Sequence, residues 1–170
     1  MAIIVGQKSN FLFRCQSISW LEESRIPRVA AHMEAIEPRV LKSEVEIIPS
    51  WLDRNQISSL DVSLFRGLKN LEHLLLNENK ITTLDANLFQ DLQKLRLLWL
   101  HENQITTLDA NLLRGLKSLE DLRLQGNQIT LLDSNLFNDL TALKKLDVSR
   151  NKITFLDASL FMGLTELRIL

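Results

Sequence analysis

The chain has 170 residues, and its 20 lysine and arginine residues nearly balance its 21 aspartate and glutamate residues, leaving a formal net charge of −1. Apolar residues make up 45% and charged residues 24%, which excludes a disordered chain and indicates a soluble folded protein. The balanced charge argues against nucleic-acid binding, and no apolar run is long enough to insert into a membrane. The single cysteine, Cys15, excludes an internal disulfide framework, and with three histidines it cannot complete a typical Cys/His zinc site.

Residues 1–46 form an N-terminal segment that follows no repeat. A helix is expected over the amphipathic stretch 28–37, directly after Pro27. The apolar start, Met1 to Val5, is too short for a signal-peptide core, and no asparagine lies in a glycosylation motif. We interpret residues 1–46 as a cap that covers the first strand of the following region.

Residues 47–170 repeat with a period of 24 residues, in about five units and a truncated one. Each asparagine of the repeat is followed two positions later by isoleucine, five positions later by leucine and six positions later by aspartate. A second period of 48 residues appears where glycine and aspartate alternate, at Gly67, Asp91, Gly115, Asp139 and Gly163. So many matching columns indicate stacked repeats, in which neighbouring units share one continuous core.

Each unit can be interpreted from its residue types. Leu74 and Leu76 have the spacing of a short strand with one buried face, and the polar residues 77–80 turn the chain out of that strand. Asn79 can satisfy the backbone groups of the turn, because its amide both donates and accepts hydrogen bonds. Asp85 is suited to cap the short turn or helix that follows.

The pattern Leu71-x-x-Leu74-x-Leu76-x-x-Asn79-x-Ile81-x-x-Leu84-x-x-x-x-Phe89-x-x-Leu92 resembles the 24-residue form of the leucine-rich repeat family, as found in Toll-type receptors, Slit-like proteins and small proteoglycans. The resemblance implies an α/β fold, a curved solenoid with a parallel sheet on its concave face and short helices or turns on its convex face. It also implies an asparagine ladder and a phenylalanine spine, formed by Asn55, Asn79, Asn103, Asn127 and Asn151 and by Phe65, Phe89, Phe137 and Phe161. Leu113 interrupts the spine, so we expect looser packing there.

Alternation along each strand places the residues between the leucines on the concave face. Trp51, Leu75, Leu97 and Trp99 then form an apolar patch suited to anchor a partner. Charged residues beside this patch, together with Arg150, predict a polar rim that orients the partner. The predicted binding residues are Trp51, His73, Leu75, Leu97, Trp99, His101, Asp121, Arg123, Lys145 and Asp147.

The sequence predicts no enzyme and no cofactor. His73 and His101 lack a third ordered metal ligand, Ser149 has no His–Asp pair in register, and no glycine loop suits phosphate. We therefore expect a non-enzymatic module that binds a protein ligand. The alternatives are the recognition arm of a larger membrane receptor or enzyme, and an intracellular scaffold.

The last residues leave length and compartment open. Leu164, Leu167 and Leu170 fall on repeat columns, and the sequence stops partway into a strand. The interpretations are a longer protein with further repeats or a cap beyond Leu170, a truncated gene model, or a second chain over the edge, and the first two are preferred. The family resemblance implies an extracellular or cell-surface location, and the cytoplasm is the alternative.

Overall fold

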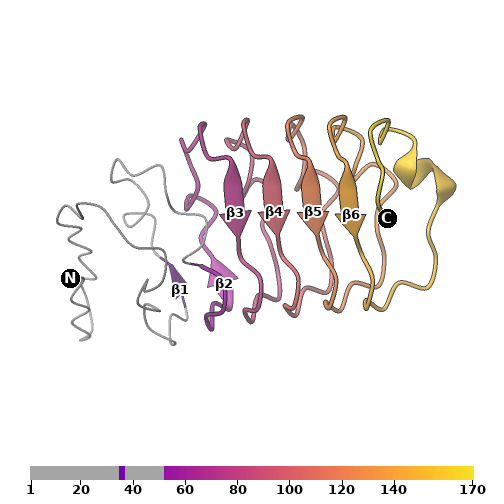
Figure 1. The fold of residues 1–170 in the computed structure, drawn as a ribbon. Coiled ribbons are helices and arrows are strands. Elements are labelled where there is room, and N and C mark those ends of the chain that lie inside the picture. Colours follow the sequence, from indigo (N-terminus) through magenta and orange to yellow (C-terminus); the bar gives the residue numbers. More distant parts are fainter. Residues whose placement is uncertain (1–34, 37–51) are drawn as a thin grey trace, which may run out of the picture.

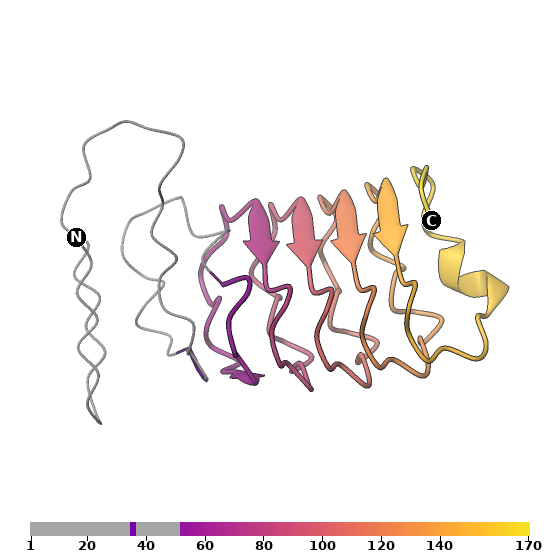
Figure 2. The same cartoon turned by 60° about the horizontal axis from the view of Figure 1, so that its bottom comes forward.

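The computed structural model describes residues 35–36 and 52–170, and these last residues form a row of stacked coils, each built from one 24-residue unit (Figures 1 and 2). Four short strands lie side by side in chain order as a parallel sheet: β3 (His73–Leu75), β4 (Leu97–Trp99), β5 (Asp121–Arg123) and β6 (Lys145–Asp147). A single bridge from Lys145 to Ile169 extends the sheet into the last unit. The connecting segments are turns, apart from one 3-10 helix at Ala158–Phe161. The predicted solenoid with a parallel sheet is confirmed.

A second, two-stranded sheet joins the N-terminal segment to the first described unit. Strand β1 (Ala35–Ile36) pairs in parallel with β2 (Ser59–Leu60). The helix expected over residues 28–37 is therefore wrong at these two positions, because their backbone pairs with Ser59–Leu60 as a strand. The rest of that stretch, Cys15, Trp51 and most of the predicted cap lie outside the described residues.

The strand register places one leucine of each strand in the core. Leu74, Leu98, Leu122 and Leu146 are direct neighbours across the sheet, and each is at most 1% exposed. Isoleucines and leucines of the turns cover them from the other side of each coil, so the core runs unbroken through the stack. Because no unit could bury this surface alone, stacking supplies the hydrophobic stabilisation.

The aromatic residues of the convex side lie in the same core. Phe65, Phe89 and Phe137 are at most 1% exposed, and the Phe65 and Phe89 ring centroids are 6.0 Å apart. Leu113 is also only 1% exposed, so the leucine keeps its place in the row without opening the core to solvent. Phe161, in the last unit, is half-buried against the same cluster.

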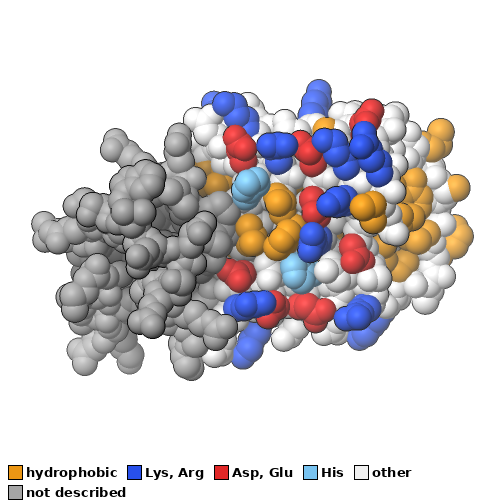
Figure 3. Space-filling view, in the orientation of Figure 1, with side chains coloured by type: hydrophobic (Ala, Val, Ile, Leu, Met, Phe, Trp, Pro, Cys, Tyr) orange, Lys and Arg blue, Asp and Glu red, His pale blue; other side chains and the backbone are white. Residues whose placement is uncertain are grey.

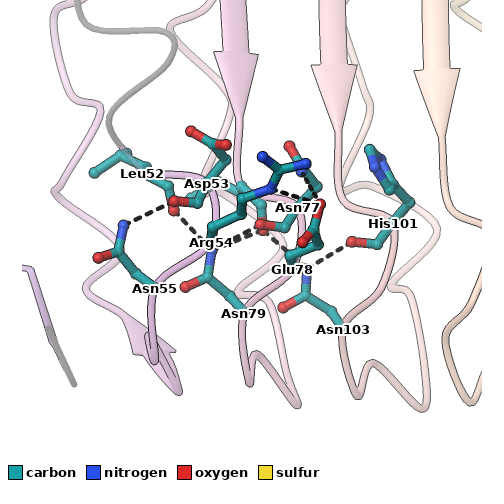
Figure 4. A network of polar contacts seen from close by, with 10 residues as sticks. Leu52, Asp53, Arg54, Asn55, Asn77, Glu78, Asn79, His101 and Asn103 are labelled. Atoms are coloured by element: carbon teal, nitrogen blue, oxygen red, sulfur yellow. Dashed lines mark hydrogen bonds and ion pairs between the residues drawn. The ribbon is translucent and has the colours of Figure 1, made fainter. Parts of the chain in front are cut away.

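Asparagine side chains hold successive coils together (Figure 4). The Asn79 Oδ1 accepts a hydrogen bond of 3.0 Å from the Ile57 N–H, and its Nδ2 donates to the carbonyls of Leu52 and Leu76 at 2.7 and 3.1 Å. Asn103, Asn127 and Asn151 repeat this pattern one unit further on each time. Each amide therefore satisfies backbone groups of two neighbouring units, while the Asn55 Nδ2 donates to the Asp53 carbonyl.

Aspartates make a second set of hydrogen bonds that recurs in every described unit. Asp85 caps its turn as predicted, because its Oδ1 accepts from the Asn87 N–H at 2.8 Å, and the equivalent aspartates do the same. The alternation of glycine and aspartate every 48 residues also has a structural reason. The N–H groups of Gly67 and Gly115, both in left-handed backbone, donate at 2.8 Å to the carboxylates of Asp91 and Asp139 in the next unit.

Candidate binding surface

The concave surface is built from three columns of side chains that the register brings side by side. His73, Leu97, Asp121 and Lys145 form the first column, and Leu75, Trp99, Arg123 and Asp147 form the second. The third column follows the strands and contains Asn77, His101, Gln125 and Ser149. The described members of these columns occupy the positions predicted from the period of the sequence.

The apolar part of this surface is a compact patch at the N-terminal end of the sheet (Figure 3). Leu97 neighbours the backbone of His73, and Trp99 neighbours Leu75. All three apolar side chains are half-buried, because each rests on the sheet and on its neighbours. We call Leu75, Leu97 and Trp99 the apolar patch. The structure brings these three together as predicted, whereas Trp51 lies outside the described residues.

Arg123 joins the charged part of the surface to the apolar patch. Its guanidinium carbon lies 4.1 Å from the centre of the Trp99 ring, within the range of a cation–π interaction. Its Nε and Nη2 donate to the two carboxylate oxygens of Asp121 at 3.2 and 3.3 Å. The Trp99 side chain is thus held between Arg123 and His101, whose ring centroid is 5.8 Å away in an edge-to-face arrangement.

His101 lies in a mixed electrostatic environment. Burial and the nearby positive charge of Arg123 lower the pKa of the His101 imidazole below its usual value. The carboxylates of Glu78, Glu102 and Asp147 act in the opposite direction but do not outweigh these two effects.

Four polar atoms near His101 are buried without a hydrogen-bond partner. They are the Asn77 Oδ1, the Gln125 Oε1, the Trp99 Nε1 and the His101 Nδ1. Asn77 as a whole is only 5% exposed. Buried polar groups of proteins are nearly always paired, so these four atoms are free to bond to water or to a ligand.

A row of alternating charges crosses the sheet at the N-terminal ends of the strands, on the side away from His101 (Figure 3). Glu120 binds Arg96 at 2.8 Å and Lys144 at 2.7 Å, and these two cations lower the pKa of its carboxyl group. Arg96 also approaches Glu72 at 3.9 Å. This row and the first column enclose a shallow pocket of about 190 Å³ that includes His73, Leu97 and Lys145.

The other edge of the surface is a turn with left-handed backbone, which the sequence interpretation missed. Arg54, Glu78, Glu102 and Arg150 have φ angles of 52° to 56°, and the fifth residue of the column is Gly126 with φ of 69°. A Cβ at Gly126 would collide with the Glu102 carboxylate, which lies over the glycine. The glycine was the only signal in the sequence, because charged residues rarely adopt this backbone.

The part of the chain that the structure describes contains neither a cluster of metal ligands nor a helix that could span a membrane. Within residues 35–36 and 52–170, no three His, Cys, Asp or Glu side chains come together as a metal site. His73 lies in the first column and His101 in the third, so the two imidazoles do not share a site. No helix in the described ranges has the length and apolar character needed to span a bilayer.

Comparison with known proteins gives one family and several related structures. A family model described as leucine rich repeat matches residues 51–101, 86–129 and 118–170. No curated protein matches the chain. Solved structures that resemble it include the TLR13–ssRNA13 complex (36% identity, TM-score 0.64), the Toll–Spatzle complex of Drosophila (30%, 0.66) and the internalin inlF of Listeria monocytogenes (31%, 0.55). These matches cover 68%, 70% and 68% of this chain but only 16%, 16% and 32% of the respective structures.

Proposed function

The chain belongs to the leucine-rich repeat family, and we propose that its concave sheet is a non-enzymatic surface for binding a protein ligand. The observation that carries this proposal is the strand register, which gathers Leu75, Leu97 and Trp99 on the open face of the sheet between two charged edges. Apolar and aromatic residues bordered by polar ones are typical of protein interfaces.

The contacts that hold the Trp99 side chain in place support its role as the anchor of the surface. Arg123 covers part of its ring, and Asp121 fixes that arginine in turn. A side chain that is already held loses little conformational entropy when a partner binds, so more of the contact energy appears as affinity. The rigid coil beneath it adds to this effect, because the buried leucines and asparagines fix the spacing between strands.

The charges of the surface favour a protein over a nucleic acid. Acidic and basic residues alternate along the upper edge, where Glu120 lies between Arg96 and Lys144, and Asp121 pairs with Arg123 on the sheet. A phosphate backbone would require a continuous basic surface. One related structure holds RNA, the TLR13–ssRNA13 complex, and another is Toll with Spatzle; the alternating charges of this chain favour a protein partner like that in the second complex.

The compartment and the wider role are part of the same proposal. The Toll and TLR13 relatives support an extracellular role as a recognition arm of a larger receptor, in preference to an intracellular scaffold. This chain spans a sixth of either structure's length.

The test is selection of binders from a random-peptide phage library on the immobilised chain. Selected peptides should lose at least about tenfold in affinity for Trp99→Ala, because interface tryptophans typically contribute more than 1.4 kcal/mol. Met162→Ala is the matched control, because Met162 is 81% exposed and lies in the last unit, outside the three concave columns. Circular dichroism verifies that both variants fold. Binders that are indifferent to Trp99→Ala, or equally sensitive to Met162→Ala, would rule out the concave patch as the binding surface.

A further inference from the structure

Two side-chain oxygen atoms of the third column have no hydrogen-bond partner among the described residues. Asn77, His101 and Gln125 hold the same position in three consecutive units, directly after β3, β4 and β5. The Asn77 Oδ1 and the Gln125 Oε1 are both buried and unpaired, on either side of His101 in this column. Both atoms accept hydrogen bonds, so what they lack is a donor.

Three carboxylates lie near the same place. Glu78, Glu102 and Asp147 all lie close enough to His101 to act on its titration. Among the described residues, Glu102 and Asp147 take part in no ion pair; Asp147 accepts one hydrogen bond, from the Ser149 N–H at 2.9 Å. The neighbouring cation, Arg123, is already occupied by Asp121 and Trp99. We call Asn77, Glu78, Glu102, Gln125 and Asp147 the acceptor cluster.

The cover of this cluster can open. Glu78 pairs with Arg54 at 3.0 Å, and these side chains are 41% and 61% exposed (Figure 4). An exposed pair of this kind contributes little stability, so its side chains can separate when a partner arrives. Asn77 lies beside this pair, with its Nδ2 3.5 Å from the Glu78 carboxylate. Movement of Glu78 would thus open the side of Asn77 to a ligand.

We propose that the acceptor cluster receives a basic side chain, an arginine or a lysine, of the protein partner. This inference rests on the proposed function and adds the chemistry of the ligand. The charged head lies beside His101 and donates to the carboxylates and to one of the two amide oxygens, since Asn77 and Gln125 follow strands that are two strand spacings apart. The apolar stem of the side chain packs on Trp99. An acidic side chain is disfavoured at this point, because it would bring a further negative charge to Glu102 and Asp147, which take part in no ion pair among the described residues.

Four synthetic peptides test the inference: acetyl-Gly-Leu-X-Leu-Gly-amide, with arginine, lysine, citrulline or glutamate at X. Citrulline keeps the shape of arginine without its charge, so it isolates the electrostatic contribution. Binding is followed at low salt by the NMR signal of the Trp99 indole N–H, assigned with Trp99→Phe. The arginine and lysine peptides should bind about tenfold more tightly than the other two, because charge-assisted hydrogen bonds are roughly twice as strong as neutral ones. Equal binding of the arginine and citrulline peptides, or preference for glutamate, would overturn the inference.

Matched variants place the effect in the acceptor cluster. Glu102→Gln and Asp147→Asn should each weaken the arginine peptide about fivefold and leave the citrulline peptide unchanged, since each removes one charge near the bound cation. Glu166→Gln is the control, because Glu166 is 54% exposed and precedes the last strand position, far along the chain from the cluster. If phage-selected binders depend on Trp99 but ignore both cluster variants, the inference fails while the proposed function stands. If no binder depends on Trp99, the proposed function fails first.

Discussion

Replacement of Asn103 by alanine should destabilise the solenoid through one unsatisfied backbone group. The Asn103 Oδ1 accepts from the Ile81 N–H at 3.0 Å, and its Nδ2 donates to the Leu76 and Leu100 carbonyls at 2.9 and 3.1 Å. Both carbonyls keep a second donor, because Asn79 also binds the Leu76 carbonyl and Asn127 binds that of Leu100. The Ile81 N–H has no substitute in its fully buried position. The expected cost is therefore about 1–3 kcal/mol, the usual penalty for one unpaired buried group.

Urea unfolding measures this cost, and amide exchange locates it. The midpoint for Asn103→Ala should fall without a change in slope, and the Ile81 amide should exchange faster than equivalent amides of other units. Asn151→Ala is the graded comparison: Asn151 binds the Ile129 N–H in the same way but is only half-buried, so water can replace part of the loss. A wild-type midpoint for Asn103→Ala, or an equal loss for the two variants, would refute the assignment of the energy to burial of the ladder.

Three further predictions concern the core, the turns and pH. Leu100→Ala, at a fully buried position, should cost about 2–5 kcal/mol in urea unfolding, and a smaller loss would mean that the coil collapses into the cavity. Gly115→Ala should cost about 1–2 kcal/mol because φ is +80°, although a Cβ there meets no atom within 4 Å; no loss in thermal unfolding would contradict the left-handed backbone. The pKa of His101 is lower in the folded chain than its usual value of 6.5, so the unfolded chain binds the proton first as pH falls. The contribution of His101 to the free energy of unfolding is therefore complete above pH 6.5. It is lost as pH falls from 6.5 through the folded pKa. His101→Gln should therefore flatten the decline of stability with acid, and parallel curves for the two proteins would contradict this.

The sequence was sufficient to predict the scaffold because the same residue type recurs at each scaffold position in several units. A strand leucine such as Leu98 has counterparts at the same place in Leu74, Leu122 and Leu146, so its burial follows from the period alone. The ladder asparagines are equally clear, since an amide recurring after each strand has to satisfy the turn beneath it. The parallel register followed as well, because an unbroken 24-residue spacing allows only one alignment of β3 to β6.

The features that the sequence did not predict occur once or depend on neighbours across the sheet. Arg123 and Trp99 lie in one column, but a column says only that two side chains are adjacent, and the stacking at 4.1 Å depends on how Asp121 orients the guanidinium. The pairing of β1 with β2 was hidden for another reason: two residues outside the period carry no repeated signal. The turn backbone was obscured because charged residues occupy it in four units, and one glycine alone indicated its left-handed conformation.

The same reasoning explains why binding specificity is concentrated in the columns that vary. The third column changes from Asn77 to His101 to Gln125, while the ladder asparagine two positions later never changes. Because the residue type of this column changes from unit to unit while the fold stays the same, the fold does not require any one of these side chains. The Asn77 and Gln125 oxygens are nevertheless buried and unpaired within the chain, which costs stability. That cost brings no benefit to the scaffold, because the ladder already satisfies the turn. A donor from outside the chain recovers it, and a charged donor forms the stronger bond, which is the physical reason for placing the ligand's basic group there.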